Sequence, residues 1–185
     1  PSSVPQMEFH FADGTVWDTD TVTRLGMTQR GGPFADSLVA NSFFASALIG
    51  LEGDDFLYGG ARNDLLNGGP GHDVLRGQGG DDFYVFGADS DVDVVTEISY
   101  EGASGTDTVR FLADVQTTDL SAERNYGTLK LLVNGSSALL WLPEWFTESG
   151  GTIELFEFAD GTVWDAAAVE TLFTPQGATS GDDLL

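Results

Sequence analysis

The strongest constraint on the fold is a nine-residue repeat that runs without interruption from Gly50 to Val85. Its four copies read GLEGDDFLY, GGARNDLLN, GGPGHDVLR and GQGGDDFYV. Each copy has an aspartate at the sixth place and a large apolar residue at the eighth, and glycine is common at the first, second and fourth places. A flexible Gly/Asp-rich linker is the alternative, but a linker has no reason to place an apolar residue at every ninth position.

The order of residue types within one copy predicts a turn followed by a short strand. Glycine adopts positive φ freely, so the glycine-rich half predicts a tight turn with exposed carbonyl oxygens. Neighbouring side chains of a strand point to opposite faces, so the eighth-place residue points away from its two neighbours. Alternating turns and strands give a flattened spiral with two copies per coil. The residues expected to stack inside it are Leu57, Leu66, Leu75 and Tyr84.

The turns also gather the oxygen ligands that Ca²⁺ prefers. Each turn offers a carboxylate and several carbonyls, and Ca²⁺ takes about six to eight such oxygens. Turns on one side of the spiral are two copies apart, which pairs Asp55 with Asp73 and Asp64 with Asp82. Mg²⁺ suits these turns less well, because it requires a strict octahedron and keeps its water. The chain has no cysteine and only two histidines for a transition metal. The expected carbonyl ligands are those of Gly50, Glu52, Gly53, Gly59, Gly60, Gly68, Gly69, Gly71, Gly77, Gly79 and Gly80.

The pattern GGxGxDxUx, in which U is a large apolar residue, resembles the RTX family of haemolysin-type calcium-binding repeats. The resemblance implies a parallel β-roll that binds two or more Ca²⁺ ions. It also implies export from a Gram-negative bacterium by type I secretion, to the extracellular space or the cell surface. The second copy departs from the pattern, because Arg62 stands where a fourth-place glycine is expected. Arg62 brings a Cβ and a positive charge into this turn, so the pattern supports the Asp55/Asp73 site more strongly than the Asp64/Asp82 site.

Degenerate copies flank the regular ones. Upstream, Asp36 and Ser46 fall at the sixth place of two copies that keep their apolar eighth residues, which predicts one more coil with little of its metal site left. Downstream, Asp93 and Asp107 continue the aspartates at wider spacing. They predict two further sites, formed by Asp73 with Asp93 and by Asp82 with Asp107.

A longer repeat sets the expected organisation of the chain. The sequence FADGTVWD occurs at 11–18 and again at 158–165, an offset of 147 residues. We therefore expect residues 1–30 to be the tail of a preceding unit and residues 31–110 to form the β-roll, with its regular repeats at 50–85. Residues 111–175 would form a strand-rich cap, and residues 176–185 would begin the next repeat block.

The expected fold class is all-β: a parallel β-roll with a strand-rich C-terminal cap and one short helix. Runs rich in Val, Ile, Leu and aromatic residues predict the strands of the cap. Asn134-Gly135 predicts a hairpin within 129–141. Residues 166–173 would form the helix, with Asp165 as its N-cap.

The composition of the chain argues against some classes of binding partner. Thirty Asp and Glu against seven Lys and Arg give a formal net charge of −23, which argues against nucleic acid and anionic membranes. No apolar run is long enough to span a membrane, and no catalytic motif such as GxSxG or HExxH is present. We therefore expect a chain that is not an enzyme and does not insert into a membrane.

The sequence is compatible with two functions. The first is a calcium-binding structural module that folds on Ca²⁺ binding after export, contacts neighbouring units of its own chain, and serves as a spacer or adhesive segment. The second is an extracellular carbohydrate-binding module in which Trp141, Trp145 and Tyr126 stack on a glycan.

Overall fold

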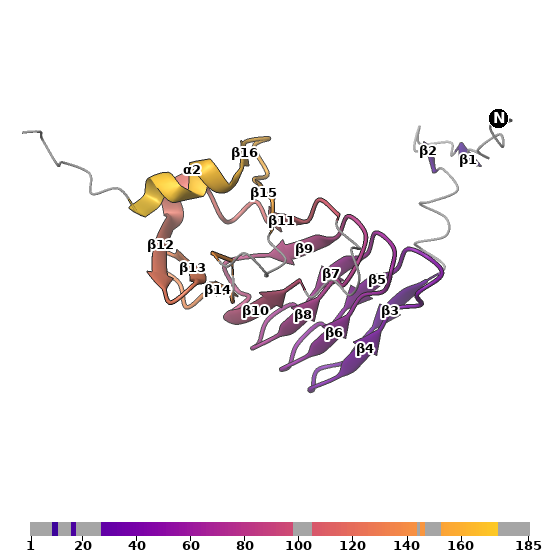
Figure 1. The fold of residues 1–185 in the computed structure, drawn as a ribbon. Coiled ribbons are helices and arrows are strands. Elements are labelled where there is room, and N and C mark those ends of the chain that lie inside the picture. The colour runs from indigo at the N-terminus through magenta and orange to yellow at the C-terminus, as the bar shows by residue number, and fades with distance from the viewer. Residues whose placement is uncertain are drawn as a thin grey trace, which may run out of the picture.

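The computed structural model describes residues 9–10, 16–17, 27–97, 105–143, 145–146 and 153–173. Residues 27–97 and 105–111 wind into a parallel β-roll in which consecutive short strands alternate between two sheets (Figure 1). This confirms the fold class expected from the nine-residue repeat. The strands of the roll are β3 (Thr28–Arg30), β4 (Ser37–Val39), β5 (Ala47–Ile49), β6 (Phe56–Tyr58), β7 (Leu65–Asn67), β8 (Val74–Arg76), β9 (Phe83–Phe86), β10 (Val92–Thr96) and β11 (Thr108–Phe111).

Each strand pairs in parallel with the corresponding strand of the next coil, two strands further along the chain. Strands β4, β6, β8 and β10 form one layer, here called the β4 sheet, whereas β3, β5, β7, β9 and β11 form the other, the β3 sheet. The register matches eighth-place residues with one another, for example Leu57 with Leu75 and Leu66 with Tyr84. One coil therefore consumes two copies of the repeat.

The segment after β11 continues both sheets at one end of the roll (Figure 1). In the β4 sheet, β14 pairs in parallel with β10, and β13 and β12 follow it in antiparallel order. In the β3 sheet, β15 pairs in parallel with β11, and β16 closes the edge in antiparallel order. The elements of this cap are η1 (Thr117–Asp119), β12 (Leu120–Asn125), β13 (Thr128–Val133), β14 (Leu139–Leu142), β15 (Leu155–Glu157), β16 (Val163–Trp164), α2 (Ala166–Glu170) and η2 (Thr171–Phe173).

Local sequence explains several of these elements. The β13–β14 hairpin is present, and Gly135 takes the positive φ that its turn requires. Helix α2 begins where expected, because Asp165 Oδ1 accepts a hydrogen bond from the Ala168 N–H at 2.9 Å. Within the described part of the chain, no helix has the length and hydrophobicity needed to span a bilayer.

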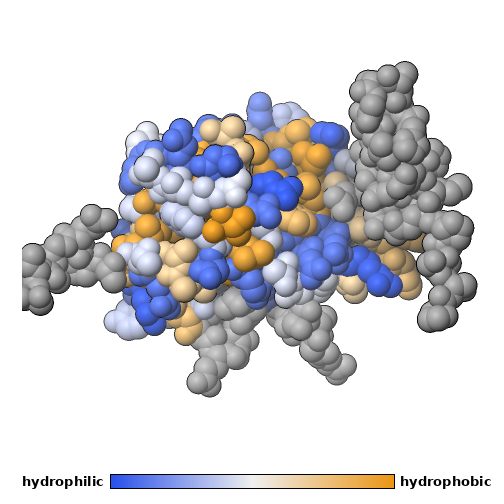
Figure 2. Space-filling model, turned by 90° about the horizontal axis from the view of Figure 1, so that it is seen from above, coloured by the Kyte–Doolittle hydropathy of each residue, from blue (hydrophilic) through white to orange (hydrophobic). Residues whose placement is uncertain are grey.

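The core runs as one cluster from the roll into the cap. Inside the roll it is a stack of single apolar side chains, among them Leu48, Leu57, Leu66 and Leu75, each at most 1% exposed. Towards the cap it becomes aromatic, and Phe111 stacks on Phe158 with their ring centroids 4.9 Å apart. Outside, polar and apolar residues form a mosaic on the face seen from above (Figure 2).

A third, two-stranded sheet joins β1 (Phe9–His10) and β2 (Val16–Trp17). It pairs Phe9 with Trp17, as the cap pairs Phe156 with Trp164. The two copies of the duplicated motif therefore have the same antiparallel register.

Removal of an eighth-place side chain should destabilise the roll. Leu66→Ala deletes a fully buried side chain and leaves a cavity, so we expect a loss of about 2–5 kcal/mol of unfolding free energy. Urea unfolding at saturating calcium measures it. The matched control is Leu112→Ala, at a leucine that is 44% exposed. Equal losses in the two variants would contradict the assigned core.

Candidate calcium sites

Two rows of polar residues lie between the coils, one on each side of the roll, and all of them except the half-buried Asp36 are buried. The Asp73 row consists of Asp36, Asp55, Asp73 and Asp93, and the Asp82 row consists of Ser46, Asp64, Asp82 and Asp107. Within each row, the Oδ1 atom of an aspartate accepts a hydrogen bond from the backbone N–H of its counterpart in the preceding coil, at 2.7–3.1 Å. The structure thus brings together Asp55 with Asp73, Asp64 with Asp82, Asp73 with Asp93, and Asp82 with Asp107.

The second carboxylate oxygen separates these aspartates into two groups. The Oδ2 atoms of Asp55, Asp73, Asp82 and Asp93 are buried and accept no hydrogen bond. In contrast, Asp36 Oδ2 and Asp64 Oδ2 each accept a bond of 2.6 Å from the N–H of the second-place glycine of their own turn. Buried polar oxygens normally have a partner, so the first group fits oxygens that coordinate a cation.

In the nine-residue copies, the conformation of the turn follows the same division as the Oδ2 atoms. Where the fourth place is glycine, at Gly53, Gly71 and Gly80, both the second and the fourth residues have positive φ, and we call these turns open. Where it is Phe34 or Arg62, neither place has positive φ, and we call these turns closed. A side chain with a Cβ rarely adopts positive φ, so the residue type at the fourth place selects the conformation.

Carbonyl oxygens of one coil crowd the turn glycines of the next. A Cβ added to Gly71 would overlap the Gly53 carbonyl, and one added to Gly50 would lie 2.5 Å from the Gly68 carbonyl and overlap Asp55 Oδ2. Carboxylate and carbonyl oxygens therefore converge in the turns without a hydrogen-bond donor for every one of them. Hard oxygen ligands of this kind suit Ca²⁺.

Comparison with known families agrees with this donor set. Residues 47–69 and 58–93 match the RTX calcium-binding nonapeptide repeat (4 copies). Residues 47–93 are RTX calcium-binding repeats. Residues 129–168, which lie in the cap, match the haemolysin-type calcium binding protein related domain. A search of curated proteins found no match to the chain.

The carbonyls expected to be ligands have different surroundings in the RTX turns. The carbonyls of Gly50, Gly53, Gly68, Gly77 and Gly80 face a turn glycine of a neighbouring coil. The Gly59 carbonyl accepts a bond from Gln78 Nε2, and the Gly60 carbonyl accepts one from the Gly79 N–H. Gly69 and Gly71 hold positive φ in the open turn, whereas Glu52 is exposed. Sequence reasoning missed the carbonyl of Leu51, which a Cβ on Gly69 would overlap.

Burial raises the pKa values of aspartates in both rows. Burial raises the pKa of Asp55, and it raises the pKa of Asp73 and Asp107 to about 6. For Asp82 and Asp93 it raises the pKa to about 8. Neighbouring carboxylates raise these values further, whereas the backbone N–H donors lower them. The ion pairs of His72 with Asp54 and of Arg110 with Glu157 lie outside the rows.

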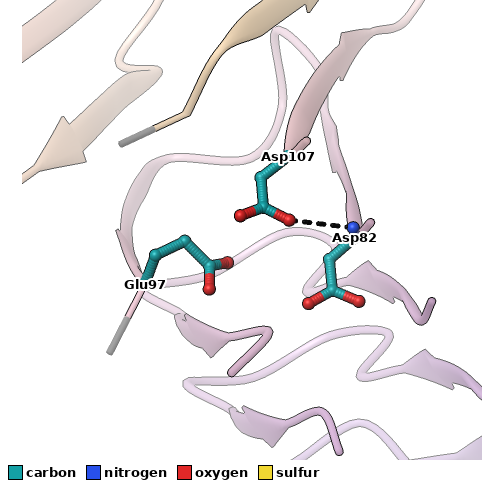
Figure 3. A group of neighbouring side chains, drawn as sticks. All are labelled: Asp82, Glu97 and Asp107. Atoms are coloured by element: carbon teal, nitrogen blue, oxygen red, sulfur yellow. Dashed lines mark hydrogen bonds between the residues drawn. The ribbon is translucent and has the colours of Figure 1, made fainter. Parts of the chain in front are cut away.

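Glu97 is a buried carboxylate that sequence reasoning missed. It follows β10, lies beside Asp82 and Asp107 (Figure 3), and is 9% exposed. Burial, followed by the charges of Asp107 and Asp82, raises its pKa to about 9. A further missed residue is Glu154, whose Oε2 accepts a bond of 2.7 Å from the Asp107 N–H and so ends the Asp82 row in the cap.

The aromatic residues considered for a glycan differ in exposure. Trp145 is 6% exposed, donates its Nε1–H to the Ile153 carbonyl, and packs edge-on against Phe146. Its ring therefore has no free face for a sugar. Trp141 is 38% exposed beneath the Lys130 ammonium, and Tyr126 is fully exposed in the turn after β12.

The calcium-free protein should be more stable in mild acid than at neutral pH. The raised pKa values mean that the folded state binds protons more tightly than the unfolded chain, whose aspartates have a pKa near 3.8. This contribution to stability is complete below about pH 4 and is lost as the pH rises through about 6 to about 8. Circular dichroism in EDTA should show more β-structure at about pH 5 than at about pH 8. An equally folded protein at both values would contradict this.

Restoring the fourth-place glycine should convert a closed turn into an open one. Arg62→Gly allows positive φ and removes a cation, which should free Asp64 Oδ2 from the Gly60 N–H. We expect one additional bound Ca²⁺ ion by isothermal titration calorimetry. Ala61→Gly is the control, because it adds a glycine to the same turn at the third place. Identical isotherms for wild type and both variants would reject the role of the fourth place.

Proposed function

We propose that this chain is a calcium-dependent structural module of a secreted RTX-like protein, which folds when Ca²⁺ binds after export. The observation that carries the proposal is the set of buried Oδ2 atoms without a partner, in Asp55, Asp73, Asp82 and Asp93. The residues that would hold the ions are these aspartates with Asp107 and the turn carbonyls. The module acts through binding and folding, without a catalytic step.

The energetics of the rows support folding on calcium binding. Without a cation, the roll must bury aligned carboxylates in a chain whose formal net charge is −23. The sites exist only in the coiled state, so the free energy of Ca²⁺ binding appears as folding free energy. Extracellular calcium modules have Kd values of about 10⁻⁴–10⁻³ M. Such a module stays unfolded where calcium is scarce inside the cell and folds outside it.

Repetition of the FADGTVWD segment and of its strand pairing supports a role as a spacer or adhesive segment. The β1–β2 and β15–β16 pairings have the same register, at an offset of 147 residues from Phe9 to Phe156. The same offset relates Asp36 to Asp183 in the sequence. Phe34 and Phe43 in the first coil are each 78% exposed, which supports a contact there with a preceding unit. Units strung in this way would form a calcium-stiffened rod.

A calcium titration of the EDTA-treated chain tests the proposal directly. Circular dichroism at about pH 8 should show β-structure appearing as Ca²⁺ is added, and Mg²⁺ at the same concentration should have a smaller effect. A chain that is folded without calcium and unchanged by it would overturn the proposal.

A single aspartate that serves two sites sharpens this test. Asp73→Asn removes the charge of a residue whose Oδ1 accepts the Asp55 N–H of the preceding coil and whose own N–H donates to Asp93 of the following coil. We expect the midpoint of the calcium titration to rise about tenfold or more, since even outer partners of a metal site cost about 10–100-fold in affinity. Asp89→Asn makes the same change at an exposed position and should leave the midpoint unchanged. Equal midpoints for the two variants would remove Asp73 from the ligands.

A further inference from the structure

We propose that Glu97 joins Asp82 and Asp107 of the Asp82 row in a three-carboxylate site for a divalent cation, which fastens the roll to the cap. This inference rests on the proposed function and adds a ligand that the nonapeptide pattern does not contain. The matched repeats end at residue 93, so both Glu97 and Asp107 lie beyond them.

Geometry brings the three carboxylates to one point. One oxygen from each residue lies within 4.8 Å of the other two. Ca²⁺ binds oxygens at about 2.3–2.6 Å, so one ion can reach all three. Figure 3 shows the Glu97 side chain directed towards Asp82 and Asp107 from a different strand of the fold.

Two unpartnered oxygens point to a ligand at this place. Glu97 Oε1 and Asp82 Oδ2 are both buried and accept no hydrogen bond. Glu97 is 9% exposed and Asp82 is 0% exposed, so water gives these atoms little compensation. A buried charge without a counter-charge is costly, and a cation shared by the three residues removes that cost.

The surroundings supply further oxygen and little space for anything else. A Cβ on Gly77 would lie 2.6 Å from Glu97 Oε1 and would overlap Asp82 Oδ2 and the Tyr84 hydroxyl. That hydroxyl accepts a hydrogen bond from the Gly77 N–H at 2.7 Å. The oxygens of Glu97, Asp82 and Tyr84 thus converge beside one glycine of an open turn, where a side chain would not fit.

The three carboxylates come from both sheets of the roll. Asp82 and Asp107 precede β9 and β11 in the β3 sheet, whereas Glu97 follows β10 in the β4 sheet. Asp107 in turn donates its N–H to Glu154, which precedes β15 of the cap. A cation here links both sheets at the point where the cap begins. More carboxylates also give tighter Ca²⁺ binding, so this site should fill before those of the Asp73 row.

Loss of one ion from the full chain tests the proposal. Glu97→Gln should bind one Ca²⁺ fewer than wild type in equilibrium dialysis, or bind its first ion about tenfold or more weakly. Glu123→Gln, at an exposed glutamate, should match wild type. Full stoichiometry and unchanged affinity in Glu97→Gln would overturn this inference alone. Absence of calcium binding in wild type would overturn the proposed function.

Luminescence of Tb³⁺ bound in place of Ca²⁺ gives an independent readout that does not require Glu97 to be changed. Tyr84 is the aromatic residue whose hydroxyl adjoins the site, so its excitation should sensitise the ion bound there. Tyr84→Phe keeps the buried ring and should remove a large part of the emission of the first ion bound. Unchanged emission from that first ion would show that it binds elsewhere and would contradict the proposal, even if Glu97→Gln failed to fold.

Discussion

The roll depends on aspartates that are hydrogen-bonded through one oxygen and unsatisfied through the other. The Oδ1 atoms of Asp55, Asp73 and Asp82 accept the backbone N–H of their counterparts in the preceding coil and so hold consecutive coils in register. The same bond fixes the carboxylates in a buried line, where their charges repel and water cannot reach them. The hydrogen bonds that align the coils therefore also bury carboxylates that must either be protonated or bind a cation. Alignment of the coils and binding of a proton or cation thus depend on the same residues.

The hydrophobic core differs between the roll and the cap, which explains why the roll depends more on the free energy of cation binding. Each half-coil of the roll contributes one inward apolar side chain, such as Leu57 or Leu66, between two short strands. Where the roll meets the cap, Phe111 of β11 stacks on Phe156 and Phe158 of the cap. Large aromatic side chains bury much more area per residue, and hydrophobic stabilisation grows with the buried area. The cap thus has an ordinary hydrophobic core, and it also covers the edges that β10 and β11 would expose.

Local patterns in the sequence were sufficient for the coil, the pairing of the aspartates, the β13–β14 hairpin and the Asp165 cap, because each depends on spacing or on one residue type. Strand β12 was not predicted, since its second half, Glu123–Asn125, is polar and exposed and lacks an apolar alternation. Glu97 was missed for a different reason. It lies after the repeat spacing has ended, so no period assigned it to a turn, and only the packing of β10 against the roll brings it to Asp82.

The departure at Arg62 was visible in the sequence, but its consequence required the structure. One buried oxygen has two possible partners in this fold, the second-place N–H in a closed turn or a cation in an open one. Open turns place Leu51 and Gln78 at φ values of 82° and 76°, which are unfavourable for residues with a side chain. Strained backbone persists where the surroundings compensate for it. The strain lies in the same turns that hold the unpartnered oxygens of Asp55 and Asp82. Closed turns have no positive φ at their second and fourth places, and the second-place N–H satisfies the aspartate Oδ2. The fourth-place residue therefore decides whether the carboxylate of a turn is left to bind an ion.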